Sequence, residues 1–375
     1  MSTEMNYMKI CHLTSAHPLF DSRIFYKECK TLVHAGYHVA LIAQNENNEI
    51  CDGVQIYGVA KTNKRSSRLT YTLWHVYKLA MLLDADIYHF HDPELIVIGL
   101  LLRAQGKLVI YDVHEDVPLQ ILNKHWIPRW LRKFVAQIVK ITEKISTYGF
   151  NGIVAATPQI GMKFPEQKTV IVQNFPRFQE LNLTNGLIFK ERSSKLVYIG
   201  RLSAIRGIKE IVSAMELLPQ TLNAQLILAG VFDQPIFHTQ LQQIPGYKFV
   251  NFVGWKDQSE IRRILSTSQI GLVTLYPTPN FLESYPIKLF EYMAAGIPVI
   301  ASDFPLWRQI ISEAECGLLV DPLDPKAIAQ AITWLLEHQN EAQAMGQRGR
   351  RAIEKQFNWS CEESKLLQFY EKIIN

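Results

Sequence analysis

Two glutamates eight residues apart, Glu283 and Glu291, stand on either side of a proline in the stretch ESYPIKLFEYMAAGIPVIASD. Pro286 suits the first turn of a helix, where its missing N–H is no loss, and Gly296 suits the left-handed position just past the helix end. Residues 297–301 are apolar throughout, which predicts a buried strand. Glu283 is therefore expected in the loop before a helix, and Glu291 about a turn and a half inside it.

The chemistry that this arrangement suggests is the binding of a phosphorylated sugar. A helix N-terminus carries about half a positive charge and several free N–H groups, so it attracts phosphate. A carboxylate deeper in the helix can accept hydrogen bonds from a sugar hydroxyl, as the acidic residue of a dinucleotide-binding fold does for ribose. The alternative is that Glu283 is a capping residue and Glu291 a solvated surface residue.

A second anion-binding element is predicted where the strand LVYIG ends at Gly200 and Arg201, and where Arg206 leads into the following helix. Guanidinium groups match the oxygens of a diphosphate and stay charged at every working pH. Lys288, in the first turn of the helix near Pro286, is a third possible phosphate partner. The arginines could instead be surface residues of a loop, but both elements would lie at the carboxyl edge of one predicted sheet, which favours a bound nucleoside diphosphate.

Histidines and carboxylates follow two apolar strands in the first half of the chain, in HFHDPEL (89–95) and YDVHEDVP (111–118). Because both strands end there, four side chains are expected at one carboxyl edge of the sheet: His91, Asp92, His114 and Glu115. A histidine at such an edge can serve as a hydrogen-bond partner or proton shuttle near neutral pH. The spacing matches no metal-binding signature, so no metal site is predicted, and a histidine at a strand end can also be purely structural.

The loop after the first strand, TSAHPLFDSR, adds polar residues at the same edge. Asp21 is expected to cap the helix that follows, which leaves His17 and Arg23 as candidates for contacts with an acceptor or with phosphate. Neither GxxxxGK[ST] nor, after the first strand, GxGxxG occurs, so a nucleotide is not held by those two devices.

The composition is that of a globular protein with two domains. The chain has 375 residues, of which 48% are hydrophobic and 20% charged, and it is too long for one ordinary core. A formal net charge of +4 is too weak to indicate a nucleic-acid partner. The five cysteines are scattered without a CxxC pair, so neither zinc nor disulfides are predicted. No signal core or apolar run of about 20 residues occurs, so a cytoplasmic protein is expected.

The segment 123–146 is basic and contains two tryptophans, Trp126 and Trp130. Cationic helices with tryptophan can lie in a lipid headgroup layer, so peripheral contact with the inner face of a membrane is one prediction. The alternative is an ordinary surface helix packed on the protein. Its core face would then be formed by seven apolar residues: Ile127, Leu131, Phe134, Val135, Ile138, Val139 and Ile145.

Short apolar strands alternate with amphipathic helices along the whole chain, which predicts an α/β fold with parallel sheets covered by helices on both faces. The alternation breaks at a polar segment near 175–193, a predicted linker, and then restarts. We therefore expect two doubly wound Rossmann-like domains, 1–180 and 194–357. Ligands of such sheets bind beyond the carboxyl ends of the strands, so two facing domains would form a site in the cleft between them.

Taken together, these motifs resemble those of the retaining family-four glycosyltransferases of the GT-B fold. The run from Glu283 to Ile300 is similar to their E-x7-E signature with its helix and strand, YIGRLSAIRG to their phosphate loop, and FVGW (252–255) to the turn before the next helix. HFHDPEL and YDVHED resemble first-domain segments of bacterial members that build surface polysaccharides. The resemblance implies that the final helix, 358–375, crosses back to the first domain.

For the phosphates, the resemblance implies that Arg201 and Arg206 bind the diphosphate, with Gly200 in the same loop. The amides of Ile287 and Lys288 would meet phosphate at the helix N-terminus. Family members usually carry lysine at the position of Arg206, so a forked guanidinium stands here in place of a point charge.

For the sugars, the resemblance implies that Glu283 contacts hydroxyls of the donor sugar, that Glu291 contacts the ribose of the nucleotide, and that His114 stands near the reacting centre and the acceptor. The implied reaction is hexosyl transfer from a nucleoside-diphosphate sugar to a saccharide or lipid-linked acceptor, with retention at the anomeric carbon and without an obligatory metal or other cofactor. Its setting would be the assembly of cell-surface polysaccharide or glycolipid. The alternatives are a nucleotide-sugar epimerase on the same fold and a catalytically silent protein that binds a sugar nucleotide or a partner transferase.

Overall fold

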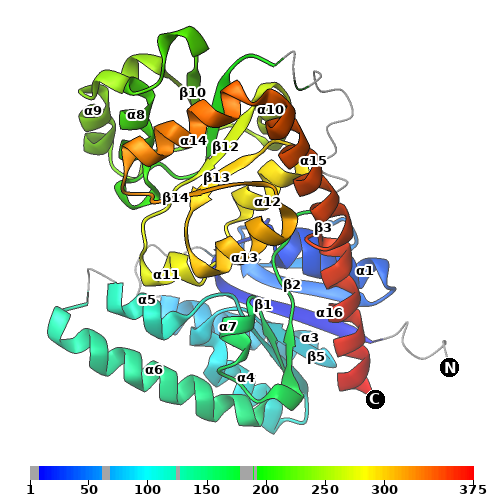
Figure 1. Cartoon of the computed structure of the whole chain (residues 1–375). Helices are drawn as coiled ribbons and strands as arrows, with labels where there is room; N and C mark the ends of the chain where they lie inside the picture. The colour runs from blue at the N-terminus through cyan, green and yellow to red at the C-terminus, as the bar shows by residue number, and fades with distance from the viewer. Residues whose placement is uncertain (1–7, 61–67, 124–126, 178–188, 190–191) are drawn as a thin grey trace. The chain divides into compact units, whose positions relative to one another are not determined.

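The computed structural model describes residues 8–60, 68–123, 127–177, 189 and 192–375 of the chain. Its contacts divide the chain into two compact units (Figure 1). Unit 1 comprises Met1–Asn174 and Trp359–Asn375, and unit 2 comprises Phe175–Asn358. The predicted linker near 175–193 lies mostly outside the described residues.

Unit 1 contains an eight-stranded sheet with the strand order β3-β4-β2-β1-β5-β6-β7-β8. Neighbouring strands pair in parallel, except that β3 is antiparallel to β4. The chain moves outward from β1 to β2 and β4 and then returns to β5 beside β1, so the sheet reverses direction between β1 and β5. Doubly wound sheets bind their ligands at such reversals. The strands are β1 (Lys9–Pro18), β2 (His38–Gln44), β3 (Glu49–Cys51), β4 (Val54–Val59), β5 (Ile87–Phe90), β6 (Leu108–Val113), β7 (Gly152–Ala155) and β8 (Thr169–Ile171).

Helices pack against both faces of this sheet through two apolar clusters. One face packs against α3 and α4, and the other against α16 and the π-helical segment Ile24–Cys29 that leads into α1. Trp359 at the start of α16 (red in Figure 1) donates from Nε1 to Thr31 Oγ1 at 2.9 Å, so the final helix returns to unit 1 as predicted. The helices are α1 (Lys30–His34), α3 (Leu73–Leu83), α4 (Ile96–Ala104), α5 (Val117–Asn123), α6 (Arg129–Gly149), α7 (Pro158–Gly161) and α16 (Trp359–Ile374).

Unit 2 contains a six-stranded parallel sheet with the order β11-β10-β9-β12-β13-β14, which reverses between β9 and β12. The two parallel sheets confirm the predicted doubly wound fold class. The strands are β9 (Lys195–Ile199), β10 (Gln225–Ala229), β11 (Val250–Gly254), β12 (Ile270–Val273), β13 (Val299–Ser302) and β14 (Gly317–Val320). The helices are α8 (Ile208–Glu216), α9 (Pro235–Gln242), α10 (Gln258–Thr267), α11 (Pro279–Leu282), α12 (Ile287–Ala294), α13 (Pro305–Ala314), α14 (Pro325–Glu337) and α15 (Gln339–Lys355).

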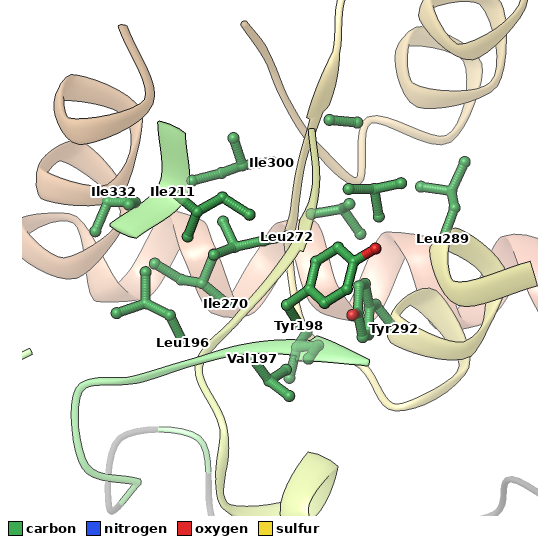
Figure 2. Packing of buried hydrophobic residues seen from close by; sticks show 14 of the residues in the cluster. Leu196, Val197, Tyr198, Ile211, Ile270, Leu272, Leu289, Tyr292, Ile300 and Ile332 are labelled. Carbon is green, nitrogen blue, oxygen red and sulfur yellow. The ribbon is translucent and has the colours of Figure 1, made fainter. Parts of the chain in front are cut away.

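Apolar strands dominate the core of unit 2, because a parallel strand covered on both faces has no side open to water. Figure 2 shows side chains of β9, β12 and β13 packed together, with Tyr198 and Tyr292 among them. The Tyr292 hydroxyl accepts a hydrogen bond from Ile199 N at 3.0 Å, which ties α12 to the end of β9. The two elements predicted to bind phosphate are thereby joined.

The long helix α6 carries apolar residues on more than one side, and only one of these sides packs against the rest of unit 1. The predicted core face is wrong for Phe134, Ile138 and Ile145, which are exposed, Phe134 by 63% and Ile145 by 67%. The residues of that face that do pack around buried Ile127 are Leu131, Val135 and Val139. Trp126 lies outside the described residues. None of the described helices is long and apolar enough to cross a membrane.

Candidate functional site

Polar side chains that follow β5 and β6 meet at the carboxyl edge of the unit 1 sheet. Because these two strands pair directly, His91 Nδ1 lies 3.1 Å from His114 Nε2. The fully buried Asp112 places Oδ2 3.2 Å from the same nitrogen of His114. The predicted gathering is thus confirmed for His91 and His114, whereas Glu115 is exposed to solvent.

Asp92 lies at the same edge but holds a different imidazole. The pairing of β1 with β2 is interrupted between Leu13 and Pro18, and the backbone there turns toward Asp92, whose Oδ2 accepts from Ser15 N at 2.6 Å. Asp92 Oδ1 lies 3.0 Å from His17 Nδ1. Burial lowers the pKa of His17, but the hydrogen bond and charge of Asp92 outweigh it, so the pKa is raised overall. His17 is therefore a second partly exposed imidazole with its own carboxylate.

The prediction that Arg23 contacts a ligand is wrong, because its guanidinium is buried in an ion pair. Nε and Nη2 of Arg23 donate to Oδ2 and Oδ1 of Asp112, each at 3.0 Å. Burial by itself would raise the pKa of Asp112, but Arg23 and the neighbouring histidines hold this pKa well below its usual range. Asp21, by contrast, caps the following helix as predicted: its Oδ1 accepts from Arg23 N at 2.8 Å and from Ile24 N at 3.0 Å.

Glu28 is a second buried carboxyl group beside the same arginine, with Oε1 2.9 Å from Arg23 Nε. Burial and the charge of Asp112 raise the pKa of Glu28 well above its usual range. The raised pKa disfavours a second negative charge beside the Arg23–Asp112 pair, which is electrically balanced without Glu28.

Two further histidines extend the cluster into the core. His12 Nδ1 lies 2.9 Å from His91 Nε2, and His89 Nδ1 lies 2.7 Å from the hydroxyl of Tyr370 on α16. Burial lowers the pKa of both His12 and His89 well below the usual value. The sequence contains a signal for them: polar residues stand at core positions of apolar strands, with His89 in β5 two residues before His91, which follows the strand end.

Four residues of the cluster bring one potential metal-ligand atom each within 4.8 Å of one another: Glu28, His89, His91 and Asp112. Imidazole and carboxylate groups are common ligands of transition metals. However, the guanidinium of Arg23 already contacts both carboxyl groups, and both ring nitrogens of His91 already have close polar neighbours, His12 at Nε2 and Asp112 at Nδ1. We therefore describe the cluster as a hydrogen-bonded network around the Arg23–Asp112 ion pair.

In unit 2 the helix expected after Pro286 is α12, which begins at Ile287, so the proline precedes the helix as its cap instead of occupying the first turn. Gly296 has φ +67°, which confirms the left-handed position just past the helix end. The first N–H groups of a helix have no partner within it. The amides of Ile287 and Lys288 are thus available to an anion at this end of α12.

The two glutamates of this region differ in environment. Glu283 follows α11 and is exposed, and its carboxylate has no hydrogen-bond partner among the residues that the structure describes. Glu291 is half-buried on α12. The loop between α11 and α12 is held by Trp307, whose Nε1 donates to Ser284 O at 2.8 Å. Glu283 is therefore an exposed acid on an anchored loop.

Arg206 and Lys288 converge on one hydroxyl at the reversal of the unit 2 sheet. Lys288 is buried and donates from Nζ to the Tyr198 hydroxyl at 2.6 Å, and the charge of Arg206 acts on the same hydroxyl, lowering its pKa against the effect of burial. Burial and the charge of Arg206 lower the pKa of Lys288 well below its usual range. Among the described residues, neither cation forms an ion pair with a carboxylate.

A glycine makes the position of Arg206 possible. Gly207 has φ +70°, and a Cβ atom there would lie 1.9 Å from Thr274 O at the end of β12. A side chain would therefore push the loop that carries Arg206 away from the sheet. The buried hydroxyl oxygens of Ser203 and Thr274, at the same edge, have no hydrogen-bond partner among the described residues.

Arg201 lies in the same loop but faces solvent. Its side chain is 72% exposed, and Nε bonds to Asp233 Oδ1 at 2.7 Å. Gly200 has φ +120°, a backbone conformation that favours glycine, and lies beside Lys288, since a Cβ atom there would be in ordinary contact with Nζ at 3.4 Å. The structure thus brings Gly200, Arg206 and Lys288 together, while Arg201 is held at the rim by Asp233.

Comparison with known proteins yields two family matches and several similar structures. The profile named Glycosyltransferase Family 4 matches residues 22–166, and that named Glycosyl transferases group 1 matches residues 179–352. A phosphatidyl-myo-inositol mannosyltransferase of Mycobacterium leprae is 26% identical over 299 residues, 77% of this chain and 74% of that protein.

Two solved structures illustrate the likeness of fold. Sucrose-phosphate synthase from Thermosynechococcus elongatus has a TM-score of 0.76 at 19% identity, covering 98% of this chain and 99% of that one. The Anabaena protein Alr3699/HepE, solved in complex with UDP-glucose, has a TM-score of 0.71 at 13% identity, covering 97% of this chain and 100% of that one. At these identities the likeness concerns the fold.

The buried histidines predict a loss of stability in acid. Burial lowers the pKa of His91 to about 4, so between pH 6.5 and 4 the unfolded chain binds a proton there that the folded chain does not, and stability falls as the pH falls. His12 and His89 act in the same direction, whereas Glu28 and Glu143, whose pKa values are raised, act in the opposite one.

A His91→Asn variant isolates one of these contributions, because asparagine does not titrate. We expect the free energy of opening β5 and β6, measured by hydrogen exchange from pH 4.5 to 7.5, to depend less steeply on pH by up to about 1.4 kcal/mol per pH unit. Tyr88→Phe, also on β5, serves as the control. It removes a buried hydrogen bond from the Tyr88 hydroxyl to Ala80 O of α3 and should keep the wild-type slope. Equal slopes for wild type and His91→Asn would contradict the assignment.

Proposed function

Because the chain belongs to the family 4 and group 1 glycosyltransferases of the GT-B fold, we propose that it transfers a hexosyl group from a nucleoside-diphosphate sugar to an acceptor hydroxyl, with retention at the anomeric carbon. The observation that carries the proposal is the pair of basic side chains, Arg206 and Lys288, at the reversal of the unit 2 sheet. Burial and Arg206 lower the pKa of Lys288, and the charge of Glu291 offsets this only in part, so the charged form of Lys288 is unfavourable until an anion joins it. A diphosphate supplies that anion, and the UDP-glucose bound by a protein of similar fold supports a nucleotide sugar as its source.

The diphosphate is the leaving group of the proposed reaction. The bond between the anomeric carbon and the β-phosphate oxygen breaks, and a bond from the acceptor oxygen forms on the same face of the sugar. The acceptor proton passes to the departing phosphate oxygen, so no protein nucleophile is needed. Arg206, Lys288 and the N-terminal amides of α12 stabilise the charge that develops on the diphosphate, and Arg201 joins them by exchanging Asp233 for phosphate.

Three further polar residues are proposed to bind hydroxyl groups of the sugars. We assign Glu283, an exposed acid on an anchored loop, to hydroxyls of the donor sugar, and Glu291, one and a half turns into α12, to the ribose. We assign His114 to a hydroxyl at the reacting centre. These three assignments extend the resemblance described above to positions whose exposure permits contact with a ligand.

For the acceptor we propose a lipid-linked or membrane-borne molecule, as in glycolipid or surface-polysaccharide assembly, because of one exposed stripe on α6. Six large apolar side chains repeat at intervals of three or four residues on its outer side and are exposed, Trp130 by 79%. We call them the α6 stripe: Trp130, Phe134, Ile138, Ile141, Ile145 and Tyr148. Four exposed cations share the helix: Arg129, Lys133, Lys140 and Lys144.

The single acid of α6, Glu143, is buried and accepts a hydrogen bond from the Tyr111 hydroxyl at 2.8 Å, so it does not offset these cations on the surface. An apolar stripe flanked by lysines is suited to the headgroup layer of an anionic membrane. The relative of Mycobacterium leprae is named for a lipid acceptor, which supports this choice.

Substitution of Arg206 tests the central proposal. We expect Arg206→Ala to lower kcat/KM for sugar transfer by about 10- to 100-fold, the effect of losing a charge-assisted hydrogen bond worth about 1.5–3 kcal/mol. Arg206→Lys, which keeps the charge, should retain most of the rate. Transfer is measured with UDP-, GDP- and ADP-sugars, after a thermal-shift screen has identified the donor that raises the melting temperature.

Arg263→Ala, at an exposed position on α10, is the matched control and should leave kcat/KM unchanged. An Arg206→Ala enzyme as active as wild type would refute the role of Arg206. A donor sugar released without any acceptor product would instead indicate the epimerase alternative.

The cations also predict that no divalent metal is needed. Because Arg206 and Lys288 already compensate the diphosphate charge, we expect treatment with EDTA to change the transfer rate by less than about twofold. Restoration of a lost rate by added Mg²⁺ or Mn²⁺ would contradict this prediction.

Vesicle binding tests the α6 stripe. The protein is expected to sediment with vesicles that contain anionic phosphatidylglycerol, and to do so less as the salt concentration rises. A Trp130→Ser, Phe134→Ser, Ile138→Ser triple variant should bind at least about 100-fold more weakly, since each buried side chain contributes roughly 1.5–3 kcal/mol. Trp255→Ser, which changes an exposed tryptophan of unit 2, should bind like wild type, and equal binding by the triple variant would rule the stripe out.

A further inference from the structure

A chain of three imidazoles runs from the core of unit 1 to its carboxyl edge. His12 Nδ1 lies 2.9 Å from His91 Nε2, and His91 Nδ1 lies 3.1 Å from His114 Nε2. His12 and His91 are buried, whereas the side chain of His114 is 15% exposed. The chain therefore connects the imidazole assigned to the sugar with groups that no ligand can reach.

The Asp112 carboxylate determines which nitrogens in this chain carry protons. Arg23 donates to both of its oxygens, and this pairing keeps Asp112 ionised, so the carboxylate can only accept. Asp112 Oδ2 also lies 3.2 Å from His114 Nε2 and 3.4 Å from His91 Nδ1. A bare nitrogen lone pair would be repelled by the ionised oxygen at these distances, so hydrogen on both nitrogens is favoured, and the 3.1 Å contact between the two nitrogens is then not itself a hydrogen bond.

The tautomers of the three rings follow from this arrangement. With its proton on Nδ1, His91 has a bare Nε2, which accepts from Nδ1–H of His12. With its proton on Nε2, His114 has a bare Nδ1, and that nitrogen forms no hydrogen bond with any residue that the structure describes. A bare ring nitrogen at a partly exposed position is an acceptor for a hydroxyl group.

We propose that Asp112, Arg23 and His91 are positioning residues that hold His114 with its Nδ1 unprotonated, so that His114 accepts a hydrogen bond from a hydroxyl of the transferred sugar or the acceptor. The identity of the hydroxyl rests on the proposed function, but the tautomer does not. His12 completes the arrangement by holding the far side of the His91 ring. The cost of burying so many polar groups is consistent with such a role, because well-packed apolar residues of similar volume often give equal or greater stability.

The tautomer can be read directly by nitrogen NMR of the full-length protein labelled with ring-¹⁵N histidine. The chain has 11 histidines, and a His114→Gln variant identifies the signals of His114. We expect Nε2 of His114 to show the shift of a protonated nitrogen and Nδ1 that of a bare one, and Asp112→Asn to abolish this preference. Protonation of Nδ1 in the wild type, or an unchanged pattern in Asp112→Asn, would overturn the proposal whatever reaction the protein catalyses.

Two substitutions of His91 separate positioning from mere packing. The amide of asparagine reaches the position of Nδ1, beside Asp112 and His114, whereas the amide of glutamine reaches that of Nε2, beside His12. His91→Asn should keep the tautomer and a kcat within about threefold of wild type, and His91→Gln should lose the tautomer and at least about tenfold in kcat. Equal losses in both variants would refute the proposal.

Tyr88→Phe is the stability control, because it weakens the same strand through a hydroxyl that bonds to Ala80 O and accepts from Ala85 N, away from the imidazoles. It should lower the melting temperature without lowering kcat. If Asp112→Asn fails to fold, the comparison of His91→Asn with His91→Gln and the nitrogen spectrum of the wild type still test the proposed tautomer. If the wild type transfers no sugar, the proposed function fails, while the spectra continue to test the tautomer.

Discussion

A charge that is removed from water has to be compensated by an opposite charge or by hydrogen bonds, and this constraint governs both polar regions of the molecule. Unit 1 satisfies it internally. Asp112 is fully buried, and Arg23 closes a bidentate pair on it, so carboxylate and guanidinium cancel inside the core. Burial and the charge of Asp112 raise the pKa of Glu28, which disfavours a second negative charge beside this pair.

Unit 2 meets the same constraint in the opposite way. Lys288 is buried against Tyr198 and near Arg206, so two basic groups and a hydroxyl meet without an ion pair to a carboxylate among the described residues, and the charge of Glu291 compensates Lys288 only in part. We propose that a bound ligand supplies here the compensation that unit 1 finds in Asp112. A closed polar network holds side chains in fixed positions, whereas an open one supplies binding energy, and the proposed division of labour between His114 and the diphosphate site follows from this difference.

Both polar regions lie at the same kind of position in the backbone fold. In each unit the sheet reverses beside its first strand, between β1 and β5 and between β9 and β12, and the polar residues stand at or just beyond the carboxyl ends of those strands. Parallel strands need long crossover connections, so their carboxyl ends collect loops from distant parts of the chain. Arg23, His91 and Asp112 come from three such segments.

Local patterns in the sequence were sufficient for the α/β alternation, the helix after Pro286 and the Asp21 cap, because each depends on residues only a few positions apart. They were also sufficient to place His91 and His114 at one edge, since strand ends in a parallel sheet coincide. They failed for the outer side of α6, where Phe134 and Ile138 fit a core face by spacing alone. Spacing identifies an apolar side of a helix but not which side another element covers.

What the sequence determined by itself was therefore the fold class, the family and the cationic loop around Arg206, all of which rest on contiguous motifs. Only the tertiary structure decided that Arg23 binds Asp112 and not a ligand, and that His12, His89 and Glu28 join the same cluster. These contacts link residues up to 281 positions apart, as in the bond between His89 Nδ1 and the Tyr370 hydroxyl. Ion pairing and burial depend on which atoms are close in space. Residues so far apart in the sequence become close only after the chain has folded.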